Sequence, residues 1–310
     1  MLRVLTIAGL AVATPLLTGC TGTWDTITSR NFRKDPFNTT YHMWHPEDPM
    51  VVLRADPPRD GDERAKAMLR LKEPLAIGLS QRDQDEVVDM LARTATKDAS
   101  PVLRIAAIEA LGRFEDARAP GILMIAYQKA HGRPEGVPDP VQPPSAIQLT
   151  GGSAGRMPGR AASTIPFTGP TGFAPDTVEA IQCRTLESLG RTSRAEVVSF
   201  LASVAVGPKG DSAPAGADDR DVRLAAVRGL GRCRQPEAVV ALAQVLAAEK
   251  GKDTAIIGRA HDGLVHLTGK HLPADPQKWD AVVQAGVAIA PEPNWVENAV
   301  QNTVSWVKQQ

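Results

Sequence analysis

The stretch that decides the fold is Ser100–Tyr127, which reads SPVLRIAAIEALGR, FEDARAP and GILMIAY. Ser100 and Pro101 can begin a helix, because serine often caps a helix N-terminus and proline is tolerated at the first helical position. The apolar residues that follow recur at the spacing of one helix face: Leu103, Ala107, Ile108 and Leu111. Gly112 can adopt the left-handed conformation that often ends a helix. The stretch is therefore predicted to form an antiparallel helical hairpin.

The same pattern recurs along the chain with a period of about forty residues. The matching positions in an earlier copy are Arg64, Ala67, Met68 and Leu71, and those in a later copy are Arg223, Ala226, Val227 and Leu230. Two weaker copies end at Gly190 and at Thr268, and in the first of these Gln182 replaces the arginine. One such hairpin has a buried face and too little partner surface of its own, so the copies are expected to stack.

LRIAAIEALG at 103–112 and VRLAAVRGLG at 222–231 resemble the signature of HEAT-like repeats, in the branch first described in phycobilisome lyases. The resemblance covers roughly residues 62–273 and implies an α-solenoid, usually a protein-binding scaffold and only sometimes an enzyme. We therefore predict an all-α fold: a short right-handed α-solenoid of about five HEAT-like helical hairpins, with a disordered insertion and a helical C-terminal cap.

Six segments follow from this reading. They are a lipoprotein signal peptide (1–19), an extended tether or N-terminal cap (20–61), HEAT-like repeats 1–2 (62–131), a disordered insertion rich in proline and glycine (132–175), HEAT-like repeats 3–5 (176–273) and a C-terminal helical cap (274–310). No amphipathic face can be drawn through the insertion, and its apolar content is too low to offset the entropy of ordering. Asp176 with Glu179, and Ser193 with Glu196, have the spacing of helix capping boxes.

The N-terminus has the order of a secretory signal: a positive end, an apolar run from Val4 to Leu17, and then Leu-Thr-Gly-Cys at 17–20. These last four residues resemble the lipobox of bacterial lipoproteins, which implies lipid attachment at Cys20. A plain cleaved signal or a membrane anchor that happens to end in cysteine is the alternative. Thr21, where some inner-membrane lipoproteins carry aspartate, favours the periplasmic face of the outer membrane. The protein is thus expected to be secreted and lipid-anchored in the cell envelope.

Residues 21–60 carry little periodicity but hold a large share of the few aromatic residues: Trp24, Phe32, Phe37, Tyr41 and Trp44. Two interpretations remain open. The segment either covers the exposed apolar end of the first repeat, which terminal repeats require, or serves as a docking peptide for a partner. The covering role is favoured.

Histidines raise the question of a metal site. His42 and His45 lie near Glu47 and Asp48, but on no regular element, so solvated loop histidines are the favoured interpretation. Three further histidines, spaced by five residues, scatter around a helix instead of lining one face: His261, His266 and His271. We predict no metal and no cofactor.

Arginines at matched repeat positions invite two interpretations: an anion-binding stripe, or structural ion pairs. In HEAT-like repeats the equivalent residue often pairs with acids of a neighbouring repeat, and this structural role is favoured for Arg64, Arg104 and Arg223.

The positions of Cys183 and Cys233 within the repeat differ by nine residues if both lie on the first helices of adjacent repeats. Nine residues correspond to about 13 Å along a helix. A disulfide needs α-carbons within about 7 Å, so no bond between them is predicted.

Composition and absent motifs limit the function. The chain of 310 residues balances 35 basic against 35 acidic residues, whereas nucleic-acid binding needs a basic footprint. It contains no nucleophile elbow, phosphate loop, dinucleotide fingerprint or Cys-x-x-Cys. We therefore expect no catalytic residues and a scaffold that binds an unknown envelope protein. The alternative is a noncanonical enzyme or metal-binding protein, lyase-like, on the same scaffold.

Overall fold

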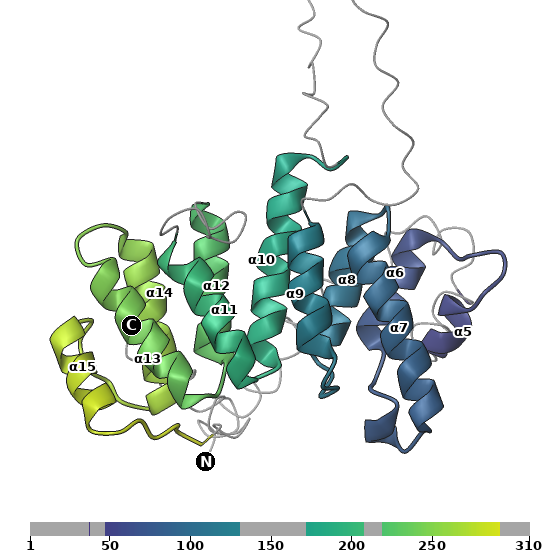
Figure 1. The fold of residues 1–310 in the computed structure, drawn as a ribbon. Helices are drawn as coiled ribbons and strands as arrows, with labels where there is room; N and C mark the ends of the chain where they lie inside the picture. Colours follow the sequence, from purple (N-terminus) through teal and green to yellow (C-terminus); the bar gives the residue numbers. More distant parts are fainter. Residues whose placement is uncertain (1–36, 38–46, 131–171, 208–218, 292–310) are drawn as a thin grey trace, which may run out of the picture. The chain divides into compact units, whose positions relative to one another are not determined.

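The computed structural model describes residues 37, 47–130, 172–207 and 219–291 (Figure 1). Within these ranges it contains eleven α-helices, α5 to α15, one 3-10 helix and no strand. The chain divides into two compact units, residues 1–58 and 59–310, which are described separately. The all-α fold class is thus confirmed for the described part of the chain.

In the first unit, residues 47–58 are described without a gap and contain the short helix α5 (Pro49–Leu53). The side chain of Asp48 caps it by accepting a hydrogen bond of 2.7 Å from the backbone nitrogen of Met50. The helix begins here because Asp48 and Pro49 together form a good helix start. That residues 20–61 serve as an extended tether or N-terminal cap stays a prediction. The aromatic residues of this segment other than Phe37 lie outside the described residues.

In the described part of the second unit, ten α-helices follow one another as five consecutive pairs, here called hairpins. The pairs are α6 (Gly61–Arg70) with α7 (Gln81–Lys97), α8 (Pro101–Leu111) with α9 (Ala119–Lys129), α10 (Pro175–Arg191) with α11 (Ala195–Val206), α12 (Arg220–Arg232) with α13 (Pro236–Ala248), and α14 (Thr254–Thr268) with α15 (Pro276–Gln284). A 3-10 turn, η1 (Leu75–Ile77), lies between α6 and α7. The last helix, expected as part of a C-terminal cap, takes the place of the second helix in the fifth pair.

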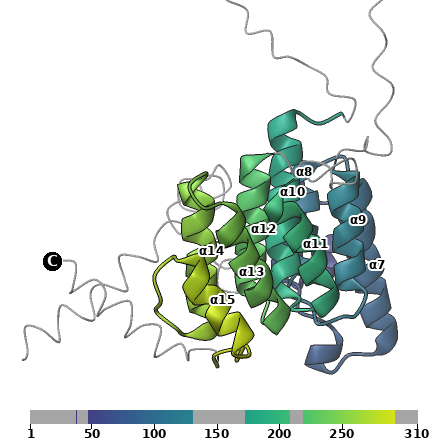
Figure 2. The same ribbon diagram turned by 60° about the vertical axis from the view of Figure 1, so that its left-hand side comes forward.

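The hairpins stack so that their helices form two layers (Figures 1 and 2). The first helices pack in the order α6, α8, α10, α12, α14. In the second layer α7 packs on α9, α11 on α13, and α13 on α15. The rings of Tyr127 in α9 and Phe200 in α11 meet edge to face with centroids 5.3 Å apart, which connects the second layer across the middle. This arrangement is an α-solenoid.

The repeat positions identified in the sequence form the core between the layers. All of the following are fully buried: Ala107, Ile108, Leu111, Leu186, Leu189, Ala226, Val227, Leu230, Leu264 and Leu267. Each fully buried Leu, Ile or Val side chain contributes about 1.5–3 kcal/mol before entropy is subtracted. Stability therefore comes from the stacking of neighbouring hairpins.

The glycines of the repeats have a different role from the one expected. Gly112 follows α8 with φ of −66°, a right-handed and not a left-handed conformation. Its small size matters instead, because a Cβ there would lie 2.7 Å from the Cβ of Ser188 in α10. Further along the first layer, a Cβ on Gly190 would lie 2.6 Å from the α-carbon of Gly229, so α10 and α12 touch through their backbones.

Helix caps also differ from the expectation. The hydroxyl of Ser100 makes no capping hydrogen bond, although α8 begins at Pro101 as predicted. The two proposed capping boxes do not form, because α10 begins at Pro175, one residue before Asp176, and Ser193 adopts a positive φ of 49°. The capping box that does form begins α7, where Ser80 and Asp83 exchange hydrogen bonds.

Arg104 holds together the two ends of the chain that flank residues 131–171. Its Nη1 atom donates to the carbonyl oxygen of Lys129 at 3.4 Å, at the end of α9. Its guanidinium carbon lies 5.0 Å from the ring centroid of Phe173, just before α10. The predicted disordered insertion, 132–175, lies mostly outside the described residues, but its last four residues, 172–175, are described and lead directly into α10.

Candidate functional site

The matched arginines were the first candidates for a site, and the structure gives them a structural role. Arg104 is 1% exposed, and its Nε atom donates to the carbonyl oxygen of Asp98 at 2.7 Å. Burial lowers the pKa of Arg104, and the nearby charge of Asp98 opposes this shift. With its bond to Lys129, Arg104 joins the C-terminal ends of α7 and α9, where backbone carbonyls lack partners within the helix.

Arg223 repeats this geometry in the fourth hairpin. Its Nε atom donates to the carbonyl oxygen of Ala205 at 3.3 Å, and its Nη2 atom pairs with Glu249 at 2.5 Å. Arg64 lies 3.9 Å from the carboxylate of Asp98. The structural role is confirmed with one correction: Arg64 and Arg223 pair with acids at the end of their own hairpin. Arg104 and Arg223 also bind a carbonyl oxygen of the preceding hairpin.

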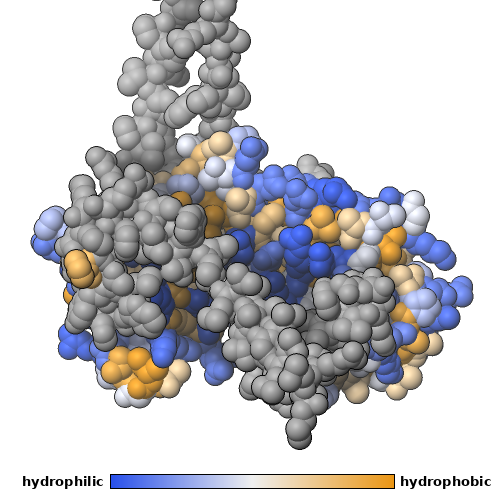
Figure 3. Space-filling view, turned by 180° about the vertical axis from the view of Figure 1, so that it is seen from behind, coloured by the Kyte–Doolittle hydropathy of each residue, from blue (hydrophilic) through white to orange (hydrophobic). Residues whose placement is uncertain are grey.

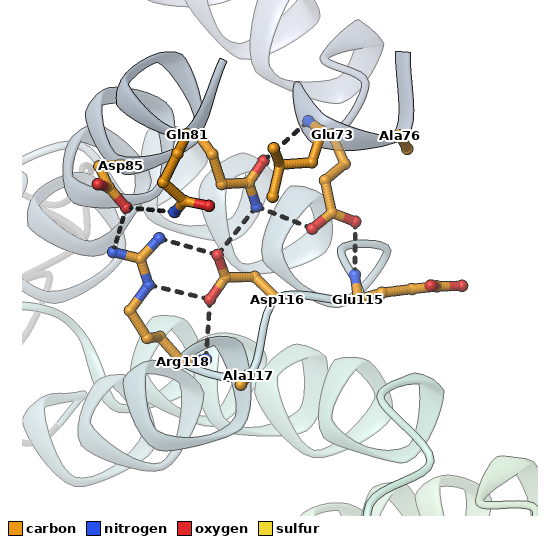
Figure 4. Close-up of a pocket in the computed structure, with 10 residues that line it drawn as sticks. Glu73, Ala76, Gln81, Asp85, Glu115, Asp116, Ala117 and Arg118 are labelled. Atoms are coloured by element: carbon orange, nitrogen blue, oxygen red, sulfur yellow. Dashed lines mark hydrogen bonds and ion pairs between the residues drawn. The ribbon is translucent and has the colours of Figure 1, made fainter. Parts of the chain in front are cut away.

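A different set of residues forms an open pocket of about 600 Å³ between the first two hairpins (Figure 4). It is built from the α6–α7 loop, the start of α7 and the α8–α9 loop. The lining residues are Glu73, Leu75, Ala76, Gln81, Gln84, Asp85, Glu115, Asp116, Ala117 and Arg118. The loops of two consecutive repeats thus meet around one hollow.

Gln84 is the side chain that holds these segments together, and it is fully buried. Its amide nitrogen donates to Glu73 at 2.8 Å and to Asp116 at 2.9 Å, and its amide oxygen accepts from the backbone nitrogen of Leu75 at 3.3 Å. The other oxygen of Glu73 accepts from the backbone nitrogen of Glu115 at 2.7 Å. A buried amide must satisfy its donors and acceptor, and here it does so by bridging both loops.

Asp116 and Arg118 form the charged side of the pocket. The Nε and Nη2 atoms of Arg118 donate to the two carboxylate oxygens of Asp116 at 3.0 and 2.8 Å, and Nη1 pairs with Asp85 at 2.9 Å. Hydrogen bonding by Arg118 holds the pKa of Asp116 well below its usual range, and that bond raises the pKa of Arg118. Asp116 is therefore ionised at neutral pH. Four acidic residues line the pocket against one arginine, so its lining is negative.

The pocket was not predicted from the sequence, although one residue carried a signal for it. Gln84 stands one turn before Val87 and Val88 on the buried face of α7. A polar residue at an apolar position of a helix indicates a buried hydrogen-bond network. Its partners, Glu73 and Asp116, are 11 and 32 residues away, and no local pattern reveals such pairs.

Several sequence-predicted residues do not contribute to this pocket. Cys20, His42 and His45 lie outside the described residues. The Nε2 atom of His261 lies 2.6 Å from the carbonyl oxygen of Leu272, and its ring lies against Trp279. In the part of the chain that the structure describes, no three His, Cys, Asp or Glu side chains are grouped to hold a metal ion.

The two remaining cysteines are free thiols, one in the body of α10 and one just after α12. Burial raises the pKa of Cys183 to about 12, with nearby acids adding to the shift, and raises that of Cys233 to about 11. Both are thus protonated and weakly reactive at neutral pH. That they remain unbonded in the cell is still a prediction.

The fold and its contacts define a helical-repeat protein of the α-solenoid class. Residues 222–248, which span most of α12 and all of α13, match the family described as PBS lyase HEAT-like repeat, so the chain contains a HEAT-like repeat. Searches of curated proteins and of solved structures returned no significant match. Among the described residues, no helix combines the length and apolar character that crossing a bilayer requires.

Proposed function

We propose that the protein is a lipid-anchored scaffold that binds another protein in the bacterial cell envelope. One observation carries the proposal: the polar residues that the repeats share, Arg104 and Arg223 above all, bind neighbouring helices within the array. These contacts maintain the stack. What a stack of this kind offers is an extended surface of many modest contacts, as in other repeat proteins.

The anchor is proposed to be a lipid on Cys20, on the resemblance of residues 17–20 to a lipobox. Each buried methylene of an acyl chain contributes about 0.8 kcal/mol to membrane binding, so two or three chains hold a protein stably. Metabolic labelling of the full chain with an alkyne-bearing palmitate tests this in a bacterial host. Label should appear on the wild type and disappear in Cys20→Ser. Label that persists in the variant would overturn the anchor and leave the scaffold unaffected.

The scaffold itself is tested by cross-linking in cells that produce the protein, followed by mass spectrometry. A single partner recovered in stoichiometric amount supports the proposal.

The competing function is a noncanonical enzyme or metal-binding protein. Purified full-length protein that contains stoichiometric zinc or iron, lost in a His42→Ala, His45→Ala double variant, would favour that alternative.

A further inference from the structure

The α6–α7 loop exposes three large apolar side chains within five residues. Leu75, Ile77 and Leu79 are 47%, 53% and 51% exposed. Figure 3 shows a hydrophobic group at the lower left, the place that this loop takes when the view of Figure 1 is turned by 180°. Isolated exposed apolar residues are ordinary, but a contiguous group of them often marks an interaction site.

The loop presents these side chains in a fixed conformation. The backbone nitrogen of Leu79 donates to the carbonyl oxygen of Pro74 at 2.9 Å, and that of Gly78 donates to Leu75 at 3.1 Å. Gly78 has φ of +82°, which glycine adopts without strain. The Ser80 capping box fixes the end of the loop where α7 begins. A surface held rigid before binding loses less conformational entropy when a partner docks.

The apolar loop borders the negatively lined pocket. Leu75 and Ala76 belong to the pocket lining, together with the acidic side chains of Glu73, Asp85, Glu115 and Asp116 (Figure 4). Arg118 is the one basic residue of that lining, and it is already paired with Asp85 and Asp116. The surface next to the three apolar side chains is therefore suited to a cation.

We propose that the loop at 74–80 and the adjoining pocket form the docking site for a segment of the partner protein that combines large apolar side chains with lysine or arginine. The inference rests on the proposed scaffold function and names its surface. Charge complementarity sets the occupant: the acids of the pocket attract a basic segment and repel the anionic headgroups of a membrane. Gln84 is a positioning residue, since it holds both loops around the pocket.

A random twelve-residue peptide library, selected on the purified full chain, tests the site. Enriched peptides should combine Leu, Ile, Phe or Trp with Lys or Arg. Their affinity, measured by fluorescence anisotropy, should fall at least tenfold in Ile77→Ser. The matched control is Ile125→Ser, on α9, where the side chain is 47% exposed and lies outside the pocket lining. This control should bind as the wild type does.

The charge component is tested separately with Glu115→Gln. The Glu115 side chain is exposed, and its backbone nitrogen still donates to Glu73 after the substitution. Affinity for the enriched peptides should fall about threefold, and binding should become less sensitive to salt, as expected for a lost surface charge. Unchanged affinity and salt dependence would contradict the proposed role of the acidic lining.

Three outcomes would overturn the docking site. The first is a selection that yields acidic peptides, peptides bound equally by Ile77→Ser, or no peptides. The second is binding of phosphatidylglycerol vesicles that requires Ile77. The third is a dimer, detected by sedimentation, that Ile77→Ser dissociates. None of these decides the scaffold function, which fails only if cross-linking in cells recovers no partner.

Discussion

Two junctions between hairpins of the same array are built in opposite ways. Between the third and fourth hairpins, Gly190 and Gly229 bring the backbones of α10 and α12 into contact. Between the first and second hairpins, Gln84 and its carboxylate partners link the two loops through hydrogen bonds, and an open pocket remains beside them. One repeat period thus produces both a dry, closed junction and a polar, open one.

The difference shows where such an array can specialise. The closed junction depends on the absence of side-chain volume and therefore tolerates almost no change. The open junction depends on hydrogen bonds between side chains, which leave room for a ligand. We therefore expect a ligand to bind at the open junction and not at the closed one. Substitutions at the two junctions should differ accordingly in their effect on stability and binding.

The largest effect is expected from Gly190→Ala. The added Cβ would lie 2.6 Å from the α-carbon of Gly229, and backbone atoms cannot move aside as a flexible side chain can. We expect a loss of about 3 kcal/mol or more in the free energy of unfolding, measured by denaturant titration. Gly258→Ala, in α14 with nothing within 4 Å, is the control and should stabilise by up to about 1 kcal/mol. A cost below about 1 kcal/mol at Gly190 would disprove the closed junction.

Gln84→Ala should produce the next largest effect. It removes three hydrogen bonds and leaves two half-buried carboxylates, Glu73 and Asp116, and the backbone nitrogen of Leu75 without this partner. We expect a loss of about 2 kcal/mol in the free energy of unfolding, together with weaker binding of the library peptides. Gln81→Ala, on the exposed side of the same helix, should change stability by less than about 0.5 kcal/mol. If both variants lost the same free energy of unfolding, the hydrogen bonds of Gln84 would make no contribution to stability.

Asp116→Asn should change how stability depends on pH. The folded-state pKa of Asp116 lies below its ordinary value of 3.8, chiefly because Arg118 hydrogen-bonds to it. Its stabilising contribution is therefore complete above about pH 5 and is lost as pH falls through the lowered pKa. Unfolding at pH 2–5 should show a smaller loss of stability on acidification in the variant than in the wild type. A slope in Asp116→Asn equal to that of the wild type would contradict the assignment.

The smallest effect, and the opposite sign, is expected for Ser188→Ala. The hydroxyl of Ser188 is buried against Gly112 and has no hydrogen-bond partner among the described residues. Its removal should stabilise the protein by about 0.5–1 kcal/mol, since a buried unpaired group is lost and alanine favours the helix. Ser199→Ala, exposed on α11, isolates the helix-propensity share in the same denaturant titration. A destabilised Ser188→Ala would show that the hydroxyl does have a partner.

The repeat was readable from the sequence because its information is local. Apolar residues at helical spacing identified the buried face, and α8 begins at Pro101, as the sequence predicted. The role of Gly112 was misread, because its conformation was inferred from its place at a helix end. The actual constraint comes from Ser188, 76 residues later in the chain.

The pocket was not predicted, for a related physical reason. Its geometry depends on Gln84 meeting Glu73 and Asp116 across two loops, and such a meeting follows from the stacking of hairpins and not from the spacing within one. The sequence carried one signal, a polar Gln84 one turn before Val87 and Val88 on the buried face of α7, and it did not lead to a prediction. The identities of its partners needed the three-dimensional arrangement.

The contacts of Arg104 bear on how the protein should respond to insertions and deletions between α9 and α10. Arg104 contacts both Lys129 and Phe173, so the described residues on either side of 131–171 lie within reach of a single guanidinium. The helices on either side then keep their register whatever the length of chain between them. This position should accept a grafted domain or a shortened connection, and is a natural place to attach a reporter without disturbing the stack.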